Sequence, residues 1–219
     1  MNFQPVLENK RVLLQPLQLE YLDDLWTIAS DASLWAIQLY EINTKQDLEK
    51  YLQKALRERD AEESIPFVII DKQENRIAGS TRYMGVSLPN KRTEIGATWI
   101  DPALHGSGLN KAMKFAMLQY AFEVMDLNRV EFKTDELNTQ SRNAILSLGC
   151  TQEGIFRRHM ITSTGRVRNT VYFSMLKEEW PEAKQRVFGK YDFYDLAKKR
   201  RSKVARINTY VPLHLSAFA

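Results

Sequence analysis

The distribution of apolar and polar residues divides the chain into helical and extended segments. Apolar residues recur three and four positions apart in some stretches, which predicts amphipathic helices at residues 18–30, 45–60, 109–125 and 139–148. Other stretches are rich in β-forming residues or alternate between apolar and polar residues. They predict strands at residues 11–17, 65–70, 76–86, 93–100, 129–134, 153–161 and 167–176. This order of elements favours an α/β domain.

The turns between these segments predict how the strands pair. Short polar turns join residues 65–70, 76–86 and 93–100, which favours an antiparallel meander. Residues 93–134 read as a strand, a loop, a helix and a strand, so the two strands of this unit should be parallel neighbours. The Ser-Thr-Gly sequence at residues 163–165 indicates a hairpin between the last two strands.

Helix-capping residues mark two of the predicted helices. Thr44 is a suitable N-cap for the helix at residues 45–60, with Asp47 at the third helical position. Gly149 follows the helix at residues 139–148 and is a plausible C′ residue.

The segment between the first two helices, residues 34–42, is apolar without being periodic. It contains Trp35, Leu39 and Tyr40. Such a connection either lines a substrate entrance or covers one end of the core, and the sequence leaves both interpretations open.

A loop with two glycines connects the strand at residues 93–100 to the following helix. Asp101-Pro102 ends the strand, and His105-Gly106-Ser107-Gly108 leads directly into the helix. The N–H groups of a first helical turn lack intrahelical partners, and the helix dipole adds partial positive charge. Glycines also permit close backbone approaches that side chains would block. The loop is therefore either a phosphate or pyrophosphate cradle or an ordinary strand-to-helix turn.

The composition is that of an ordinary globular protein. The chain has 219 residues, of which 44% are hydrophobic and 26% are charged, and one large α/β domain is the simplest arrangement. No stretch resembles a transmembrane segment or a signal peptide, so we expect no membrane association and a cytoplasmic location.

Charge and cysteine content narrow the chemistry. Residues 181–219 carry nine Lys or Arg and three Asp or Glu, so the basic character belongs to this tail and says little about the main domain. Cys150 is the only cysteine, which excludes an intramolecular disulfide and a cysteine-based metal site. We expect a buried structural thiol, and we predict no metal site.

Several motifs between residues 12 and 180 occur in an order that resembles a known family. His105-Gly106-Ser107-Gly108-Leu109-Asn110 stands in the place of a pyrophosphate motif, Gln/Arg-x-x-Gly-x-Gly/Ala. Further fragments are EFKTDELNTQSRNAILSLG (131–149), EGIFRRHM (153–160), RNTVYFS (168–174) and EEW (178–180). Together they resemble the GNAT superfamily of acyl-CoA N-acyltransferases, and most closely its RimJ/RimL-like branch, the ribosomal-protein alanine N-acetyltransferases.

This resemblance has two departures. His105 stands where Gln or Arg is usual, and Asn110 stands where Gly or Ala is usual. In the family both positions act largely through backbone N–H groups, which any residue except proline supplies. We therefore expect a working cradle.

The resemblance implies an architecture and a reaction. The GNAT fold has a mixed central sheet of about seven strands, a splayed parallel central pair, and helices on both faces. We expect a GNAT domain at residues 1–180 and a basic C-terminal extension at residues 181–219, partly helical or partly disordered. The implied activity is that of an acetyltransferase in which a substrate amine attacks the thioester of acetyl-CoA directly, without a covalent enzyme intermediate.

The resemblance also implies cofactor-binding residues. The cradle would hold the pyrophosphate of coenzyme A through His105, Gly106, Ser107, Gly108, Leu109 and Asn110. The backbone of Thr98, Trp99 and Ile100 would contact the pantetheine arm and the thioester carbonyl, while the side chains of Trp99 and Ile100 belong to the core. Asn138 would bind the pantetheine arm, and Ser141 would bind the cofactor and donate a proton to the leaving thiolate. Both residue types also favour helix N-termini, so simple capping is the alternative.

Glu94 is the first candidate for the catalytic base. It lies on the strand that borders the implied thioester, and alternation would place Glu94, Gly96 and Thr98 on one face. An exposed strand glutamate is the alternative. His159 is a second candidate, although its alternating strand is more typical of a structural role. At pH 7 roughly a tenth of an α-amine with pKa near 8 is neutral, against under a thousandth of a lysine, so an α-amine acceptor needs at most a water-relayed base.

The acceptor implied is a primary amine, with a protein N-terminus favoured over a small molecule. The alternatives are an acetyltransferase that detoxifies an antibiotic or a polyamine, and a GNAT-like binding module that has lost catalysis. The basic run at residues 198–203 either contacts RNA, ribosomes or anionic surfaces, or forms a solvated helix face or a disordered end. Aromatic and apolar residues at 191–196 would pack on the domain itself or on a second subunit, which leaves a homodimer open.

Overall fold

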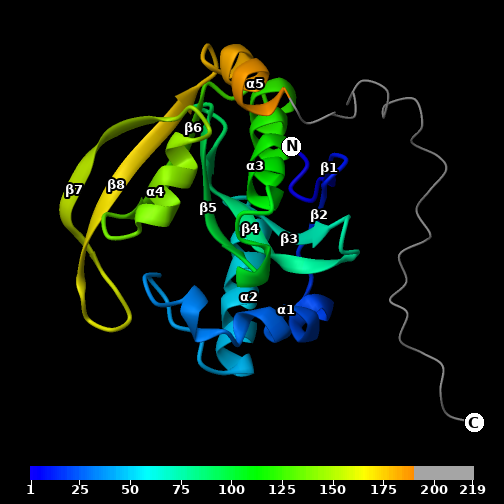
Figure 1. Ribbon diagram of the computed structural model, residues 1–219, viewed down its shortest axis with the longest axis vertical. Helices are drawn as coiled ribbons and strands as arrows, with labels where there is room; N and C mark the ends of the chain where they lie inside the picture. Colours follow the sequence, from blue (N-terminus) through cyan, green and yellow to red (C-terminus); the bar gives the residue numbers. More distant parts are fainter. Residues whose placement is uncertain (190–219) are drawn as a thin grey trace, which may run out of the picture.

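A mixed eight-stranded β-sheet forms the centre of the molecule (Figure 1). The computed structural model describes residues 1–189 of the chain. The strands lie in the order β1-β2-β3-β4-β5-β6-β8-β7, and within this part of the chain β5 and β6 form the parallel pair. The strands are β1 (Leu7–Glu8), β2 (Val12–Pro16), β3 (Ser64–Asp71), β4 (Arg76–Ser87), β5 (Arg92–Ile100), β6 (Arg129–Asp135), β7 (Thr151–Ile161) and β8 (Val167–Leu176). The predicted α/β class, antiparallel meander and parallel β5–β6 pair are confirmed.

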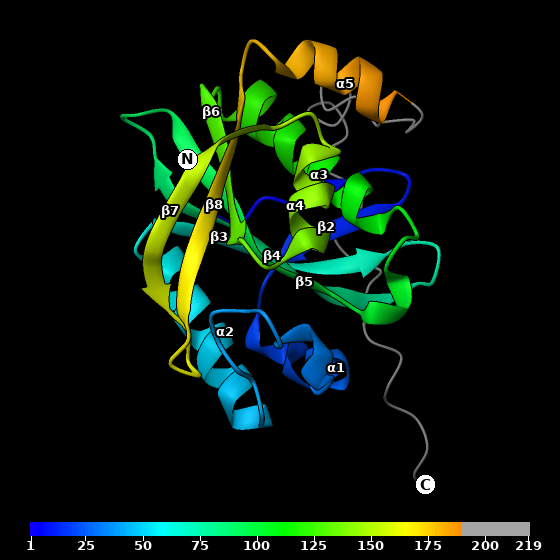
Figure 2. The ribbon, with the colours of Figure 1, turned by 60° about the vertical axis from the view of Figure 1, so that its left-hand side comes forward.

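Helices cover both faces of this sheet (Figures 1 and 2). The α-helices are α1 (Leu22–Ala29), α2 (Lys45–Asp60), α3 (Leu109–Gln119), α4 (Thr139–Leu146) and α5 (Trp180–Phe188). Short 3-10 helices lie at Leu19–Tyr21, Ala32–Leu34 and Pro102–Leu104, and a π-helical turn at Tyr120–Val124 continues α3. The helix predicted at residues 109–125 is therefore confirmed, with a change of winding near its end.

Each face of the sheet has its own hydrophobic core. On one face, Leu25 of α1 and Leu48 of α2 pack with Trp99 of β5. On the other face, Phe115 of α3 and Phe132 of β6 belong to a larger core that also contains residues of α4 and α5. The sheet is therefore enclosed between two layers of helices, as the resemblance implied.

Local signals explain why some elements match the sequence prediction closely. α2 has the predicted bounds, and the Asp47 N–H donates to the Thr44 hydroxyl at 3.2 Å while the Thr44 N–H donates to the Asp47 carboxylate at 3.0 Å. These reciprocal bonds form a capping box. The additional eighth strand, Leu7–Glu8, has only two residues, too few for periodicity to reveal.

The parallel pair β5 and β6 separates after three paired positions. Arg92–Glu94 pair with Arg129–Glu131, and beyond them β5 pairs with β4 while β6 pairs with β8. The two strands therefore diverge, and their backbones leave a gap in the middle of the sheet.

A β-bulge changes the direction of the β5 side chains. Ala97 has a φ of +47°, and the pairing of β5 with β4 shifts register there. Thr98 consequently faces α3, where its hydroxyl accepts a hydrogen bond from Lys114 at 2.8 Å. The expectation that Glu94, Gly96 and Thr98 share one face is therefore wrong for Thr98, because the inserted residue reverses the alternation.

The last two strands form a long curved hairpin at the edge of the sheet, here called the arm (residues 151–176; Figure 2). Its turn is closed by a hydrogen bond from the Gly165 N–H to the Thr162 carbonyl at 2.9 Å, which confirms the predicted hairpin. The Ser163 N–H donates to the Leu39 carbonyl at 3.1 Å. The tip of the arm therefore contacts the connection between α1 and α2.

α5 packs against α3 in the larger core. The rings of Trp180 and Phe188 lie 5.6 and 5.1 Å from that of Phe115, centroid to centroid. The predicted division of the chain at residue 180 stays a prediction, although α5 shares its core with the preceding residues.

The basic run at residues 198–203 and the segment 191–196 lie outside the described residues. Within residues 1–189, no helix combines the length and apolar character that crossing a membrane requires.

Candidate active site

A cavity of about 620 Å³ lies where β5 and β6 separate. Residues 95–100 of β5 and residues 132–134 of β6 form two of its walls, and the first turns of α3 and α4 contribute others. Residues from segment 33–38 face the cavity from the connection between α1 and α2. The cavity is therefore lined by residues from both helical layers, with the gap between β5 and β6 in its middle.

The connection between α1 and α2 contributes both to the cavity and to the smaller core, and its role as a substrate entrance stays a prediction. Leu34 and Ile37 line the cavity. Trp35 and Ile42 are buried in the smaller core, where the ring of Trp35 lies 5.7 Å from that of Trp99.

The glycine loop forms the edge of the cavity at the start of α3. Gly106 and Gly108 have φ of +78° and +87°, in the left-handed region that glycine adopts without strain. Gly108 is the N-cap of α3 and has no side chain to bond the free N–H groups of the first turn. These N–H groups and the helix dipole make the loop suited to an anion.

The six predicted cradle residues occupy different positions in this loop. The residues that line the cavity are His105, Gly106, Gly108 and Asn110. Ser107 shapes the loop, because its hydroxyl donates to the Leu104 carbonyl at 2.7 Å and accepts from the Leu109 N–H at 3.3 Å. Leu109 is fully buried in the larger core.

His105 connects the loop to its surroundings. Its Nε2 lies 3.2 Å from the Ile100 carbonyl oxygen, and its Nδ1 lies 3.4 Å from the amide nitrogen of Gln140 on α4. The residue that departs from the family motif thus bridges β5 and α4 at the rim of the cavity.

Asn138 and Ser141 line the opposite wall at the first turn of α4. The Asn138 side-chain oxygen accepts from the Ser141 N–H at 2.9 Å, so Asn138 is the N-cap of the helix. Asn138 therefore caps the helix, and its cofactor role stays a prediction. The capping bond uses one lone pair of the Asn138 oxygen, so the second lone pair and the amide nitrogen can both serve a cofactor contact.

Thr98, Trp99 and Ile100 line the cavity at the end of β5. Trp99 and Ile100 are buried in the two cores, as expected for their side chains. The Thr98 hydroxyl lies 2.7 Å from that of Thr81. The structure therefore brings the predicted cofactor residues of β5, α3 and α4 around one cavity.

Glu94 is not among the residues that line this cavity. Its carboxylate lies in an ion pair with Lys133 of β6, with Oε2 2.8 Å from Nζ. Lys133 also lies 3.6 Å from a carboxylate oxygen of Glu131. Glu94 thus sits beside the β5–β6 gap, and its role as a base stays a prediction.

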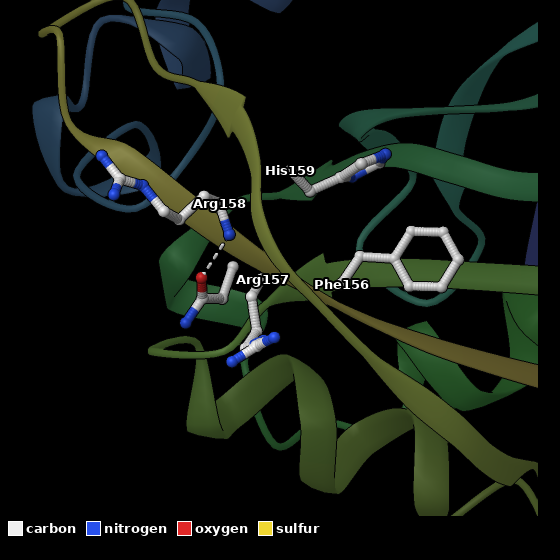
Figure 3. Close-up of a pocket in the computed structure, with 5 residues that line it drawn as sticks. Phe156, Arg157, Arg158 and His159 are labelled. Atoms are coloured by element: carbon white, nitrogen blue, oxygen red, sulfur yellow. Dashed lines mark hydrogen bonds between the residues drawn. The ribbon is translucent and has the colours of Figure 1, made fainter.

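His159 lies on β7 of the arm (Figure 3). Its ring contacts those of Phe156 and Tyr172, at centroid distances of 5.3 and 5.8 Å. Figure 3 shows Phe156 and His159 on one side of the strand and Arg157 and Arg158 on the other. These residues line an open hollow of about 880 Å³ that is separate from the cavity at the β5–β6 gap.

Lys114 of α3 is a cavity residue that the sequence analysis missed. Its side chain is 6% exposed, and its Nζ donates to the Thr98 hydroxyl and lies 5.6 Å above the ring of Phe132. Burial lowers the pKa of this ammonium group to about 7, against opposing effects of Cys150 and Glu94. The spacing of four residues from Asn110 could have revealed it, because that spacing places both residues on one helix face.

Cys150 follows α4 and is buried, as expected of a structural thiol. Burial raises the pKa of this thiol to about 12, so it is not a thiolate at neutral pH. Residues 1–189 contain no group of three or more His, Cys, Asp or Glu side chains arranged to hold a metal ion.

Comparison with known proteins identifies the family. A model described as an acetyltransferase (GNAT) domain matches residues 11–151. The Bacillus subtilis (strain 168) protein named "putative ribosomal N-acetyltransferase YdaF" is 35% identical over 91 residues, which is 42% of this chain and 49% of that protein. A GCN5-related N-acetyltransferase from Brucella melitensis is 29% identical and has a TM-score of 0.78 over 85% of each chain. Mycobacterium smegmatis RimJ in complex with CoA-disulfide is 18% identical and shares the fold, with a TM-score of 0.74 over 87% of this chain and 98% of that chain. Because the family model spans more than half of the sequence, this chain belongs to the GNAT family and is an acetyltransferase.

Proposed function

We propose that this acetyltransferase moves the acetyl group of acetyl-CoA to a primary amine, by direct attack in a ternary complex. The acceptor we propose is the α-amine of a protein N-terminus. The observation that supports this proposal is the cavity at the β5–β6 gap, which the anion cradle and segment 33–38 approach from different sides. Cofactor and acceptor can therefore meet there from separate directions.

The cofactor side of the cavity fits a diphosphate. Two helices, α3 and α4, begin there, and their N-terminal N–H groups favour anions. Lys111 and Lys114 also line the cavity, and none of its described lining residues is Asp or Glu. In this proposal residues His105 to Asn110 bind the pyrophosphate, and coenzyme A supplies the activated acetyl thioester when bound.

The pantetheine arm would lie along the open edge of β5. Beyond the split, that edge has no β6 partner, so the backbone groups of segment 98–100 that point into the gap can offer hydrogen bonds to it. Asn138 and Ser141 of α4 face the same space from the other wall. Binding of this arm would direct the thioester toward the gap.

The charges around the cavity favour a peptide over a polyamine or another polycation. Lys111, Lys114 and Lys133 line it, and this concentration of positive charge would repel a polycationic acceptor. An α-amine carries a single positive charge, and roughly a tenth of it is already neutral at pH 7. The relative YdaF has the name "putative ribosomal N-acetyltransferase", which supports the same choice.

The proton from the amine would leave on the acceptor side. We propose Glu94 as the base, acting through water because its carboxylate is paired with Lys133. Ser141, at the first turn of α4, lines the cofactor side of the cavity, and its role as a proton donor stays a prediction. The expected cytoplasmic location stays a prediction.

Acetyl-CoA titration followed by thermal unfolding tests cofactor binding. A ligand present at a hundred times its dissociation constant should add about 2.7 kcal/mol to the free energy of unfolding. Gly108→Val should remove this stabilisation, because a β-branched residue is strained at φ +87° and fills the cradle. Gly165→Val is the matched control: its φ is +81°, it lies at the tip of the arm, and it should keep the response. No stabilisation of the wild-type protein at millimolar acetyl-CoA would contradict the proposal.

Mass spectrometry of acetylated products tests the acceptor. Peptides with free N-termini, lysine-containing peptides with blocked N-termini, and polyamines should be offered with acetyl-CoA. We expect acetylation of the free α-amines. Acetylation confined to the small amines would exclude a protein N-terminus as the acceptor.

A further inference from the structure

Lys114 is a buried cation in an otherwise apolar part of α3. Eight residues of this helix are buried, and Lys114 is the charged one among them. Its acceptor is the Thr98 hydroxyl, and among residues 1–189 it makes no ion pair with an acidic side chain. Burial of a charge without such a partner is costly. Structural packing alone would favour an apolar residue such as the adjacent Met113.

The ammonium group of Lys114 lies at the gap between β5 and β6. The bulge at Ala97 turns Thr98 toward α3, and Thr98 then fixes Nζ at 2.8 Å from β5. On the other side, Nζ lies 5.6 Å above the ring of Phe132 on β6. The charge is thereby directed into the cavity at the place where the two strands diverge.

We propose that Lys114 is a catalytic residue that donates a proton to the sulfur of coenzyme A as it leaves. The inference rests on the proposed function, because it assigns a role within acetyl transfer. The amine nitrogen forms a bond to the acetyl carbon, and the carbon–sulfur bond breaks. The proton from Nζ passes to sulfur to give the thiol, while the surplus proton of the amine passes to water. Neutral Lys114 then regains a proton from solvent.

Physical chemistry supports a lysine in this position. A fixed positive charge in a site with little water stabilises negative charge that develops on oxygen or sulfur. Burial places the pKa of Lys114 near 7, and an ordinary thiol has a pKa near 8.5, so transfer to the thiolate is favourable.

Several charged groups surround this lysine. Glu94 on β5 and Cys150 after α4 raise the pKa of Lys114, whereas burial lowers it more. Lys111 on the same helix and Lys133 on β6 line the same cavity. Lys114 differs from these two lysines in being the buried one.

The experiment compares wild type, Lys114→Met, Lys114→Arg and Ser141→Ala as full-length proteins. Lys114→Met should be as stable as wild type or more stable, and acetyl-CoA should still stabilise it. Its kcat should fall about 100-fold or more, the usual effect of losing a general acid. Lys114→Arg keeps the charge but releases no proton at these pH values, so it should also be slow.

The pH profile separates a proton donor from a structural residue. In wild type, kcat/KM should have a falling limb with an apparent pKa near 7. This limb should be absent in Lys114→Met, where the rate should continue to rise as the acceptor amine loses its proton. Ser141→Ala should keep the limb.

Three results would overturn the assignment. The first is a kcat of Lys114→Met within about threefold of wild type. The second is full activity of Lys114→Arg. The third is loss of the falling limb of the pH profile in Ser141→Ala but not in Lys114→Met. If Lys114→Met does not fold, the activity of Lys114→Arg alone tests the assignment. Failure of acetyl-CoA to bind the wild-type protein would instead contradict the proposed function, so the two failures are distinguishable.

Discussion

Gly79 of β4 supports the backbone of the candidate site from behind. Its φ is +144°, and a Cβ atom there would lie 2.1 Å from the Trp99 carbonyl oxygen and 3.0 Å from the Ile100 Cα atom. Trp99 and Ile100 are the residues whose backbone we propose for the pantetheine arm. At this position, a single methyl group would therefore displace the cavity wall.

We predict that Gly79→Ala destabilises the protein by about 2–3 kcal/mol, because neither backbone segment can move without breaking pairing between β4 and β5. Gly85→Ala is the matched control, since its φ is also positive, at +55°, and no atom lies within 4 Å of its Cβ position. We expect the control to cost only about 1 kcal/mol. Urea unfolding measures both. Equal losses would show that backbone strain, and not the contact with β5, limits this position.

At the scale of elements, local signals predicted the fold well. The capping box at Thr44 and Asp47 placed the start of α2. The Gly149 signal was less exact: α4 ends at Leu146 with Ser147 as its C-cap, and Gly149, with a φ of +92°, lies two residues beyond that cap. The bulge at Ala97 has no comparable signal, because it depends on pairing with a strand distant in sequence. Lys114 is a related case: its spacing from Asn110 could have placed it on the cavity face of α3, but its burial depends on β5 and β6, which are distant in sequence.

The candidate site was predictable as far as its motifs reach. The glycine loop at residues 105–108, the start of α3 and the start of α4 were located by short sequences that fold locally. The cavity between these segments could not be located in this way, since it forms only where β5 and β6 diverge. Glu94 illustrates the limit: its strand was predicted, but its ion pair with Lys133 requires the parallel register.

The root of the arm is held by an ion pair that crosses three strands. Arg129 of β6 donates to Glu153 of β7 at 2.6 Å, and the Ser174 hydroxyl of β8 donates to the same carboxylate at 2.8 Å. The hydrogen bond from Arg129 is the main reason that the pKa of Glu153 is lowered to about 2. This carboxylate therefore ties β7 to the rest of the sheet when ionised.

This pair should make stability depend on acid pH. The pKa of Glu153 is lower in the folded protein, about 2, than in the unfolded chain, near 4.3. Its contribution to the free energy of unfolding is therefore complete above the unfolded pKa and is lost as the pH falls through the folded pKa. We expect the free energy of unfolding of the wild-type protein to fall between pH 5 and pH 2. In Glu153→Gln it should fall by a smaller amount over the same range. The difference will be modest because the side chain is 38% exposed. Glu182→Gln, at an exposed position on α5, should leave the slope unchanged. An identical slope in Glu153→Gln and wild type would exclude this role.

At the scale of the whole molecule, the tip of the arm contacts the α1–α2 connection, which lines the cavity. The connection lines the cavity through Leu34 and Ile37, and its Leu39 carbonyl accepts the hydrogen bond from Ser163 at the arm tip. Two segments more than a hundred residues apart in sequence thus support each other. The contact fixes the position of a segment that would otherwise be anchored mainly by Trp35 and Ile42.

Ser163→Pro removes the N–H group of this contact with little other change. Ser163 is the second residue of the turn closed by the bond between Gly165 and Thr162, and proline is favoured at that position of common turns. Ser163→Ala keeps the N–H group and is the control. We expect faster amide hydrogen exchange in segment 33–39 of the proline variant, because opening this segment no longer breaks the bond to the arm. The KM for the acceptor should rise several-fold, with acetyl-CoA binding unchanged, since the cradle lies on the other side of the gap. Equal exchange in the two variants would show that the loop is held by its buried aromatic residues alone.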